Sequence, residues 1–377
     1  TDKKSGLNVL QNETETVKIS IDCMGGDHGL SVTVPASLSF LKQEAAAELV
    51  LVGPQELIEA ELRKHKAENH PRIKVKNASE IVKMDDPIEV ALRRKKDSSM
   101  RVAIQLVKDG EVHACVSAGN TGALMAISRY LLKTMPGVDR PAICAILPNQ
   151  KNGPTYVLDL GANVDCEAEH LHQFALMGSA LFANIEGNPH PKIGLLNVGT
   201  EAIKGNDVVK KAGDLLHIEH ENGTLNFYGN AEGNDIFEGT CDVIVCDGFV
   251  GNVTLKSIEG LGRFVRNVLV TEFRSSLLNG LGALLAGKAL KSIRQRLNPS
   301  RFNGACMLGL RGLVFKSHGS ADAYAYECAI RRAHEAVRRD VLLRISTTMA
   351  ELLQKSKEHH AVEKTNTENG IQEQETV

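Results

Sequence analysis

The sequence predicts an α/β protein built around a mostly parallel sheet, and three observations lead to this fold class. Short apolar segments typical of buried strands alternate with segments whose apolar residues recur at helical spacing. Several of the strands run directly into glycine-rich loops that are each followed by a helix. The chain has 377 residues, of which 42% are hydrophobic, so it can bury a large core.

The first elements already follow a strand, helix, strand order. Residues 17–22 alternate apolar and polar side chains as a strand does, and a helical pattern follows at 32–41. A second strand at 48–52, a helix at 55–66 and a third strand at 73–75 repeat the order. Parallel strands need such helical crossovers, so this repetition predicts a parallel sheet.

The same alternation continues along the chain and sets its domain boundaries. Further strands are expected at 142–147, 155–158, 194–198, 224–230, 241–246 and 308–316. A helical hairpin is expected at about 254–301, and a long helix at 321–353. We therefore expect one α/β domain over 17–354, flanked by disordered polar tails at 1–16 and 355–377.

The composition is typical of an ordinary globular protein and favours a cytoplasmic location. The net charge of −2 gives no global attraction to nucleic acid or to an anionic membrane. The eight cysteines are scattered through apolar segments without a Cys-x-x-Cys pair, which is typical of reduced core thiols in a cytosolic chain. No secretory signal opens the sequence, and the apolar stretch near 277–290 is interrupted before it could span a bilayer.

The loop after the strand at 194–198 is the candidate centre of the chemistry. It carries two glycines and Lys204, and the helix at 208–216 follows it. The first N–H groups of a helix lack partners within the helix, so this position favours an anion.

Other strands end in glycine and in side chains that can bind a ligand. Gly25 and Gly26 belong to a Gly-Gly-x-x-Gly loop, which does not meet the dinucleotide-binding pattern and is compatible with either a tight turn or a ligand cradle. Ser117, Asn120 and Thr121 can donate hydrogen bonds or cap a helix. Asp159 stands at the carboxyl end of a strand, where it can contact a ligand or cap the helix that follows. Their repetition at strand ends favours a shared site.

Taken together and in order, these loops resemble those of the bacterial phosphate acyltransferases of phospholipid synthesis, the PlsX family. The matching stretches lie at 22–29, 117–123, 158–163, 197–201, 204–206, 246–252 and 318–320. The resemblance covers roughly 17–340, and Cys23 stands where the family usually has Ala.

The resemblance implies a three-layer α/β/α fold similar to isocitrate and isopropylmalate dehydrogenases and to phosphotransacetylases, and usually a homodimer. It also implies transfer of a fatty acyl group from acyl carrier protein to inorganic phosphate, without a metal or an organic cofactor. A membrane-bound glycerol-3-phosphate acyltransferase then uses the acyl phosphate.

This chemistry needs an anion site and donors for a developing oxyanion, because phosphate is largely a dianion at neutral pH and a thiolate leaves readily. We expect Lys204 and Asn252 to be catalytic. The expected phosphate- and thioester-binding residues are Asp22, Gly25, Gly26, His28, Ser117, Asn120, Thr121, Asp159, Asn163, Thr200, His318 and Ser320. Asp22, His28 and Asp159 can instead position these donors or protonate the leaving thiol, and the two aspartates can simply hold loops.

The segment after the last glycine loop combines an apolar tip with cations. Acyl carrier protein is acidic, so we expect it to dock on Arg263, Arg266, Lys288, Lys291, Arg294, Arg296 and Arg301. Peripheral membrane contact and a helix pair buried in a dimer are the alternatives for this tip. For the whole chain, the competing hypotheses are a phosphotransacetylase-like enzyme that uses acyl-CoA and a non-enzymatic scaffold that binds carrier protein and membrane.

Overall fold

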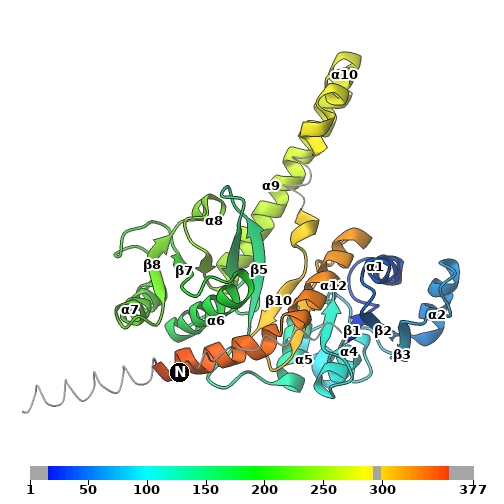
Figure 1. The fold of residues 1–377 in the computed structure, drawn as a ribbon, viewed down its shortest axis with the longest axis horizontal. Helices are drawn as coiled ribbons and strands as arrows, with labels where there is room; N and C mark the ends of the chain where they lie inside the picture. Colours follow the sequence, from blue (N-terminus) through cyan, green and yellow to red (C-terminus); the bar gives the residue numbers. More distant parts are fainter. Residues whose placement is uncertain (1–15, 292–298, 356–377) are drawn as a thin grey trace, which may run out of the picture.

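The computed structural model describes residues 16–291 and 299–355, and these form an α/β fold around a single 11-stranded sheet (Figure 1). The expected tails lie almost entirely outside the described residues, as do Arg294 and Arg296. The sheet order is β3-β2-β1-β4-β11-β10-β5-β6-β9-β7-β8. The predicted fold class, an α/β protein with a mostly parallel sheet, is confirmed.

A first strand set occupies one side of the sheet, and its neighbouring strands are parallel. In sheet order it contains β3 (Ile73–Asn77), β2 (Ala47–Gly53), β1 (Val17–Asp22), β4 (Ala114–Ser117) and β11 (Leu313–Lys316). The connecting helices are α1 (Leu30–Gln43), α2 (Gln55–Lys64), α3 (Ile88–Arg93), α4 (Ser99–Lys108) and α5 (Thr121–Leu132).

A second strand set occupies the other side, and its strands are again parallel to one another. It contains β6 (Pro154–Leu158), β9 (Val243–Val245), β7 (Lys192–Leu196) and β8 (Asn226–Ala231). Its helices are α6 (Ala168–Glu186), α7 (Asp207–Glu221) and α8 (Asp235–Glu238).

Two strands between the sets reverse the strand direction. These are β10 (Ala305–Leu308), which is antiparallel to β11 and to β5 (Ala142–Pro148), and β5 itself, which is antiparallel to β6. Three reversals in a row leave the second set running opposite to the first. The carboxyl ends of the two sets therefore point to opposite edges of the sheet.

The core lies in two layers, one on each face of the sheet. On β9, Val243 and Val245 pack into one buried cluster, whereas Ile244 packs into the other. Successive side chains of a strand point to opposite faces, so both faces are covered. Residues of α1, α6, α7 and α12 (Ala323–Arg338) contribute to the first cluster, and residues of α3, α4, α5 and α8 to the second. A layer of helices therefore covers each face of the sheet, which is the expected three-layer α/β/α arrangement.

Two helices leave the body of the molecule. Figure 1 shows that α9 (Gly248–Arg274) projects away from the sheet and carries α10 (Leu277–Leu285) at its far end. The pair is joined where the Asn279 amide donates to the carbonyl oxygen of Glu272 at 3.1 Å. Among residues 16–291 and 299–355, no helix is both long enough and apolar enough to cross a bilayer.

The expected elements near the carboxyl end differ from those observed. The strand expected from residue 308 begins only at Leu313, as β11, because residues 309–312 form a turn in which Gly309 has φ of 88°. The residues before this turn form a separate antiparallel strand, β10. The single helix expected at 321–353 is interrupted at Asp340, where φ is 51°, and helical structure resumes at 341–355. The sequence pattern missed both breaks because the apolar spacing continues across them.

Candidate active site

The loops that follow β1, β4 and β11 meet at one end of the first strand set. The backbone N–H of Asp27 donates to Gly319 at 2.8 Å, and that of Ser317 donates to Ser117 at 2.9 Å. Gly26 has φ of 85°, and a Cβ there would lie 2.8 Å from the Gly319 carbonyl oxygen. Only glycine allows this approach. The three loops therefore form one cluster, which we call the first loop cluster (22–29, 117–121 and 316–320).

Asp22 holds this cluster together. Its carboxylate accepts hydrogen bonds from the hydroxyls of Ser99 and Ser117, both at 2.6 Å, and it is almost completely buried. Burial raises the pKa of Asp22, and the two serine hydroxyls oppose this by favouring the charged form. These contacts favour the hypothesis that Asp22 positions Ser117 and its loop.

A second cluster, which follows β6 and β9, consists of the 159–163 loop together with the cap and first turn of α9 (247–252), and we call it the second loop cluster. The buried carboxylate of Asp159 accepts hydrogen bonds from backbone N–H groups of Ile143, Ala162 and Asn163, at 2.9, 3.1 and 2.7 Å. The Asn163 amide adds a fourth at 3.0 Å and also donates to Pro141. Burial raises the pKa of Asp159 against these four hydrogen bonds. Asp159 thus holds its own loop and orients Asn163.

The lysine loop opens a helix, as the sequence predicts. Asn206 caps α7 by accepting a hydrogen bond from the N–H of Val209 at 2.9 Å, and exposed Lys204 lies just before this cap. The Asn197 amide donates to the Lys204 carbonyl oxygen at 3.1 Å and so closes the loop. Because β7 neighbours β9, the loop stands at the same edge of the sheet as the second loop cluster.

Helix α9 reaches from the second loop cluster to the first. Its first turn packs so closely on the 159–163 loop that a Cβ on Gly251 would overlap the carbonyl oxygen of Asp159, and a Cβ on Gly161 would lie 3.3 Å from Cβ of Asn252. One turn later, Lys256 pairs with Glu259 at 3.1 Å, and Glu259 lies 3.3 Å from Nδ1 of His318. The helix therefore places Asn252 and the first loop cluster along one stretch of its surface.

This contact joins two groups of loops that strand direction alone would separate. The carboxyl ends of β1, β4 and β11 point to one edge of the sheet, and those of β6, β9 and β7 to the other. Burial lowers the pKa of His318, although Glu259 opposes this effect. Asn252, Lys256, Glu259 and His318 are thus the residues that connect the two clusters.

Lys316 is a site residue that the sequence analysis missed. It ends β11 and donates from Nζ to the carbonyl oxygens of Ala118, at 3.3 Å, and of Ser317. Burial is the main cause that lowers its pKa to about 8, and neighbouring Lys256 adds to the effect. The only sequence signal was its position at the end of a strand, directly before the 318–320 motif.

The remaining predicted residues are placed less centrally. The Asn120 side chain caps α5, as the alternative to ligand binding predicts. Its amide also donates a hydrogen bond to the Met84 carbonyl oxygen at 2.7 Å. Thr121 begins α5, and Gly25 and His28 line a narrow hollow with Ala118 and Gly319. Thr200 and Ser320 are exposed. Their substrate contacts stay predictions.

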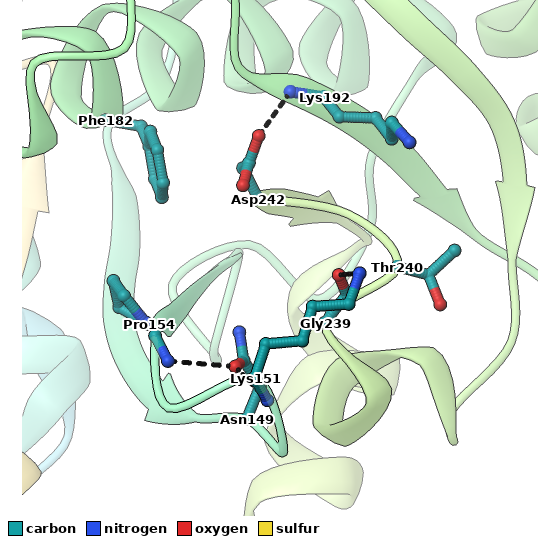
Figure 2. A pocket seen from close by; sticks show the side chains of 9 residues that line it. Asn149, Lys151, Pro154, Phe182, Lys192, Gly239, Thr240 and Asp242 are labelled. Atoms are coloured by element: carbon teal, nitrogen blue, oxygen red, sulfur yellow. Dashed lines mark hydrogen bonds between the residues drawn. The ribbon is translucent and has the colours of Figure 1, made fainter.

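A larger cavity lies elsewhere. It has a volume of about 290 Å³ and is lined by Lys151, Pro154, Phe182, Lys192 and Asp242, among others (Figure 2). Pro154 and Lys192 begin β6 and β7, whose opposite ends carry the second loop cluster and the lysine loop. Figure 2 shows Lys151 reaching the Gly239 carbonyl oxygen, at 2.7 Å, and the Lys192 side chain pointing away from Asp242. The predicted site residues do not line it.

The expected docking cations that the structure describes lie on or near the projecting helices. Arg263 and Arg266 are exposed on α9, Lys288 and Lys291 are exposed beyond α10, and Arg301 is exposed in the 3-10 turn at Pro299–Phe302.

Comparisons with known proteins identify the family of the chain. The profile of the family described as "Fatty acid synthesis protein" matches residues 17–344. A phosphate acyltransferase from Janthinobacterium sp. (strain Marseille) is 71% identical over 341 residues, which cover 90% of this chain and 95% of that protein. One from Herminiimonas arsenicoxydans is 70% identical over 341 residues, covering 90% and 96%.

Solved structures are similar in fold. A phosphotransacetylase from Streptococcus pyogenes aligns with a TM-score of 0.56 and 20% identity, covering 85% of this chain and 94% of that one. The EutD phosphotransacetylase from Staphylococcus aureus aligns with a TM-score of 0.54 and 16% identity, covering 87% and 97%. The expected likeness to the phosphotransacetylase fold is confirmed. From the profile match and the identity with these relatives, the chain belongs to the fatty acid synthesis protein family and, within it, to the phosphate acyltransferases.

Proposed function

We propose that the chain transfers a long-chain fatty acyl group from acyl carrier protein to inorganic phosphate. The product is an acyl phosphate for phospholipid synthesis, which a membrane glycerol-3-phosphate acyltransferase would consume. One observation carries the proposal beyond the family name: α9 carries Asn252 in its first turns, beside the 159–163 loop, and then contacts the loop cluster that contains Lys316 and His318. Amide, ammonium and imidazole groups along one helix suit an anionic substrate and a thioester oxygen.

In this proposal the site positions phosphate beside the thioester carbon. A phosphate oxygen attacks that carbon, the new C–O bond forms and the C–S bond breaks, so a thiolate leaves. Lys204 binds phosphate or polarises the carbonyl, and Asn252 donates to the oxyanion. Asp22 and Asp159 act indirectly, because their carboxylates are engaged by Ser117 and by the 159–163 loop.

The projecting helices supply the proposed partner surface. On α10, Leu278, Leu284 and Leu285 are 81%, 79% and 84% exposed. On α9, the cations Arg263 and Arg266 are exposed. We assign the cations to acidic acyl carrier protein and the apolar side chains to a second copy of the chain in a homodimer. Peripheral membrane contact is the alternative use of the same leucines.

The test uses purified protein, long-chain acyl-acyl carrier protein and inorganic phosphate. Any acyl phosphate is trapped with hydroxylamine under conditions that spare thioesters, and free carrier protein is measured in the same sample. We expect phosphate-dependent hydroxamate and an equal amount of free carrier protein. A short acyl-CoA that serves better than the carrier protein would instead assign the phosphotransacetylase-like activity. Bound carrier protein without product would indicate the scaffold.

A further inference from the structure

Lys316 is held in place by the backbone of the first loop cluster. Two of its three ammonium N–H bonds go to the carbonyl oxygens of Ala118 and Ser317. Within residues 16–291 and 299–355, Nζ of Lys316 makes no third hydrogen bond. A side chain that usually moves freely therefore presents one N–H at a fixed place, where the loops after β4 and β11 meet α9.

The charges around Lys316 come from each element packed against it. Lys256 and Glu259 face it from α9, Asp22 from the end of β1, and Asp27 from the loop that follows. His318, two residues on, interacts electrostatically with both Lys316 and Glu259. Burial and Lys256 lower the pKa of Lys316 to about 8, while the three carboxylates oppose the change. An amine with this pKa can release and recover a proton near neutral pH, which an ordinary lysine does not.

The carboxyl groups of the site are less suited to supply a proton. Asp22 accepts hydrogen bonds from Ser99 and Ser117, and Asp159 accepts four from its own loop and from Ile143. A carboxylate whose oxygens are engaged as acceptors holds its neighbours in position instead of donating. Compared with these two carboxyl groups, Lys316 is the better placed proton donor, because its ammonium keeps one N–H outside the two hydrogen bonds to the backbone.

We infer that Lys316 is a further catalytic residue, whose ammonium protonates the thiolate that leaves when phosphate attacks the thioester. This inference rests on the proposed function. As the C–S bond breaks, the proton moves from Nζ to sulfur and leaves a neutral amine and a free thiol. The amine then takes up the proton that the attacking hydrogen phosphate loses as it becomes the acyl phosphate dianion. The cycle neither gains nor loses a proton.

The first test is the pH dependence of turnover by the wild-type chain, with acyl-acyl carrier protein as donor and saturating phosphate. The ammonium form is needed, so kcat should fall as the pH rises through about 8. Phosphate is already a dianion there, so its ionisation does not produce this fall. A kcat that stays level between about pH 7 and 9.5 overturns the inference.

Two variants separate a proton donor from a fixed positive charge. Lys316→Gln removes the charge and the proton, and should lower kcat by about 100-fold. Lys316→Arg keeps the charge but cannot release a proton at these pH values, so it should lose about as much. Lys74→Gln, an exposed lysine on β3, is the matched control and should behave as the wild type. Melting temperatures identify any variant that does not fold, and the wild-type pH profile still decides the question in that case.

The outcomes distinguish this inference from the proposed function. Wild-type activity retained by Lys316→Arg would assign Lys316 to anion binding and overturn its role as proton donor. A loss that appears only as a raised KM for phosphate would do the same. No acyl phosphate from the wild-type chain with any donor would instead overturn the proposed function itself.

Discussion

Asp22 and Lys204 illustrate the two kinds of residue in the site. Asp22 is buried and hydrogen-bonded to two serines, so its contribution is to hold a loop. Lys204 is exposed next to a helix start, so its ammonium can reach a ligand without disturbing the core. A substitution at Lys204 should therefore change catalysis and leave folding nearly unchanged.

We predict that Lys204→Ala lowers kcat for acyl phosphate formation by about 100-fold, the loss typical of a removed oxyanion donor. Its melting temperature should stay close to that of the wild type, because surface substitutions change stability little. Lys210→Ala removes an exposed lysine from the following helix and serves as the control. Equal turnover by Lys204→Ala and Lys210→Ala would remove Lys204 from the mechanism.

Lys316 also predicts a pH dependence of stability. Its pKa is about 8 in the folded chain, against an ordinary value of 10.5. Between these values the unfolded chain binds a proton that the folded chain does not, so the free energy of unfolding rises with pH. Below pH 8 both states are protonated, and the cost of burying the charge is fully present.

The measurement compares denaturant unfolding of the wild type with that of Lys316→Gln. The wild type should gain stability relative to the variant as the pH rises from about 8 to 10.5. A constant difference across this range would show that the surroundings of Lys316 do not disfavour its charge.

At the scale of elements, α9 determines whether the two loop clusters form one site. Its amino end is positioned by backbone contact between Gly251 and Asp159, and its next turns carry Lys256 and Glu259 to the first loop cluster. A change at the first turn should therefore move all three contacts at once.

We predict that Gly251→Ala destabilises the chain by at least about 2 kcal/mol, because the added methyl group overlaps the Asp159 backbone, which cannot yield as a side chain can. Gly260→Ala is the matched control on the same helix, because a Cβ there meets nothing within 4 Å. That substitution should stabilise the helix by about 0.5–1 kcal/mol. Equal unfolding free energies for the two variants would contradict the close contact.

The cations on α9 and beyond α10 give a prediction about carrier-protein docking. Reversal of Arg263, Arg266, Lys288 and Lys291 to glutamate should raise the KM for acyl-acyl carrier protein about tenfold and weaken its salt dependence. Reversal of Lys74 and Lys76 on the far strand β3 is the control. If the KM for acyl-acyl carrier protein is unchanged in the first variant, the hairpin does not dock the carrier protein, and dimerisation or membrane contact remains as its role.

At the scale of the whole molecule, local patterns predicted the elements but not how the two halves meet. The alternation at Val17–Asp22 and the cap before α7 are local features, and both appear as expected. The reversal at β10 and β5 depends on pairing between distant segments, which periodicity does not encode. The role of Lys316 could not be predicted from the sequence, in which it is one more polar residue at the end of a strand. Its burial comes from loops and from a helix that are far away in the chain.

The same limit applies to the hydrogen-bonding residues of the site. Asn120 was compatible with a ligand or a cap, and the hydrogen bond that its side-chain oxygen accepts from the N–H of Ala123 favours the cap. Asp159 was compatible with both roles until its four hydrogen bonds were located. Residue type restricts what a side chain can do, whereas its use depends on neighbours that the fold supplies.

The apolar surface of the projecting helices bears on the assembly of the whole molecule. Leu278, Leu281, Leu284 and Leu285 on α10 are 81%, 56%, 79% and 84% exposed, and Phe264 on α9 is 65% exposed. Burial of one such side chain contributes about 1.5–3 kcal/mol, so a contiguous set favours association. We predict a dimer in which the hairpins of two copies pack together.

Sedimentation at micromolar concentration should show a dimer for the wild type and a monomer for the combined variant Leu278→Ser, Leu284→Ser and Leu285→Ser. Leu57→Ser and Leu343→Ser remove leucines that are 50% and 67% exposed elsewhere, and should leave the dimer intact. A wild type that sediments as a monomer and binds lipid vesicles through these three leucines would contradict the dimer and assign the hairpin to the membrane. The two results differ because a dimer hides the leucines in solution, whereas a membrane anchor keeps them accessible until lipid is added.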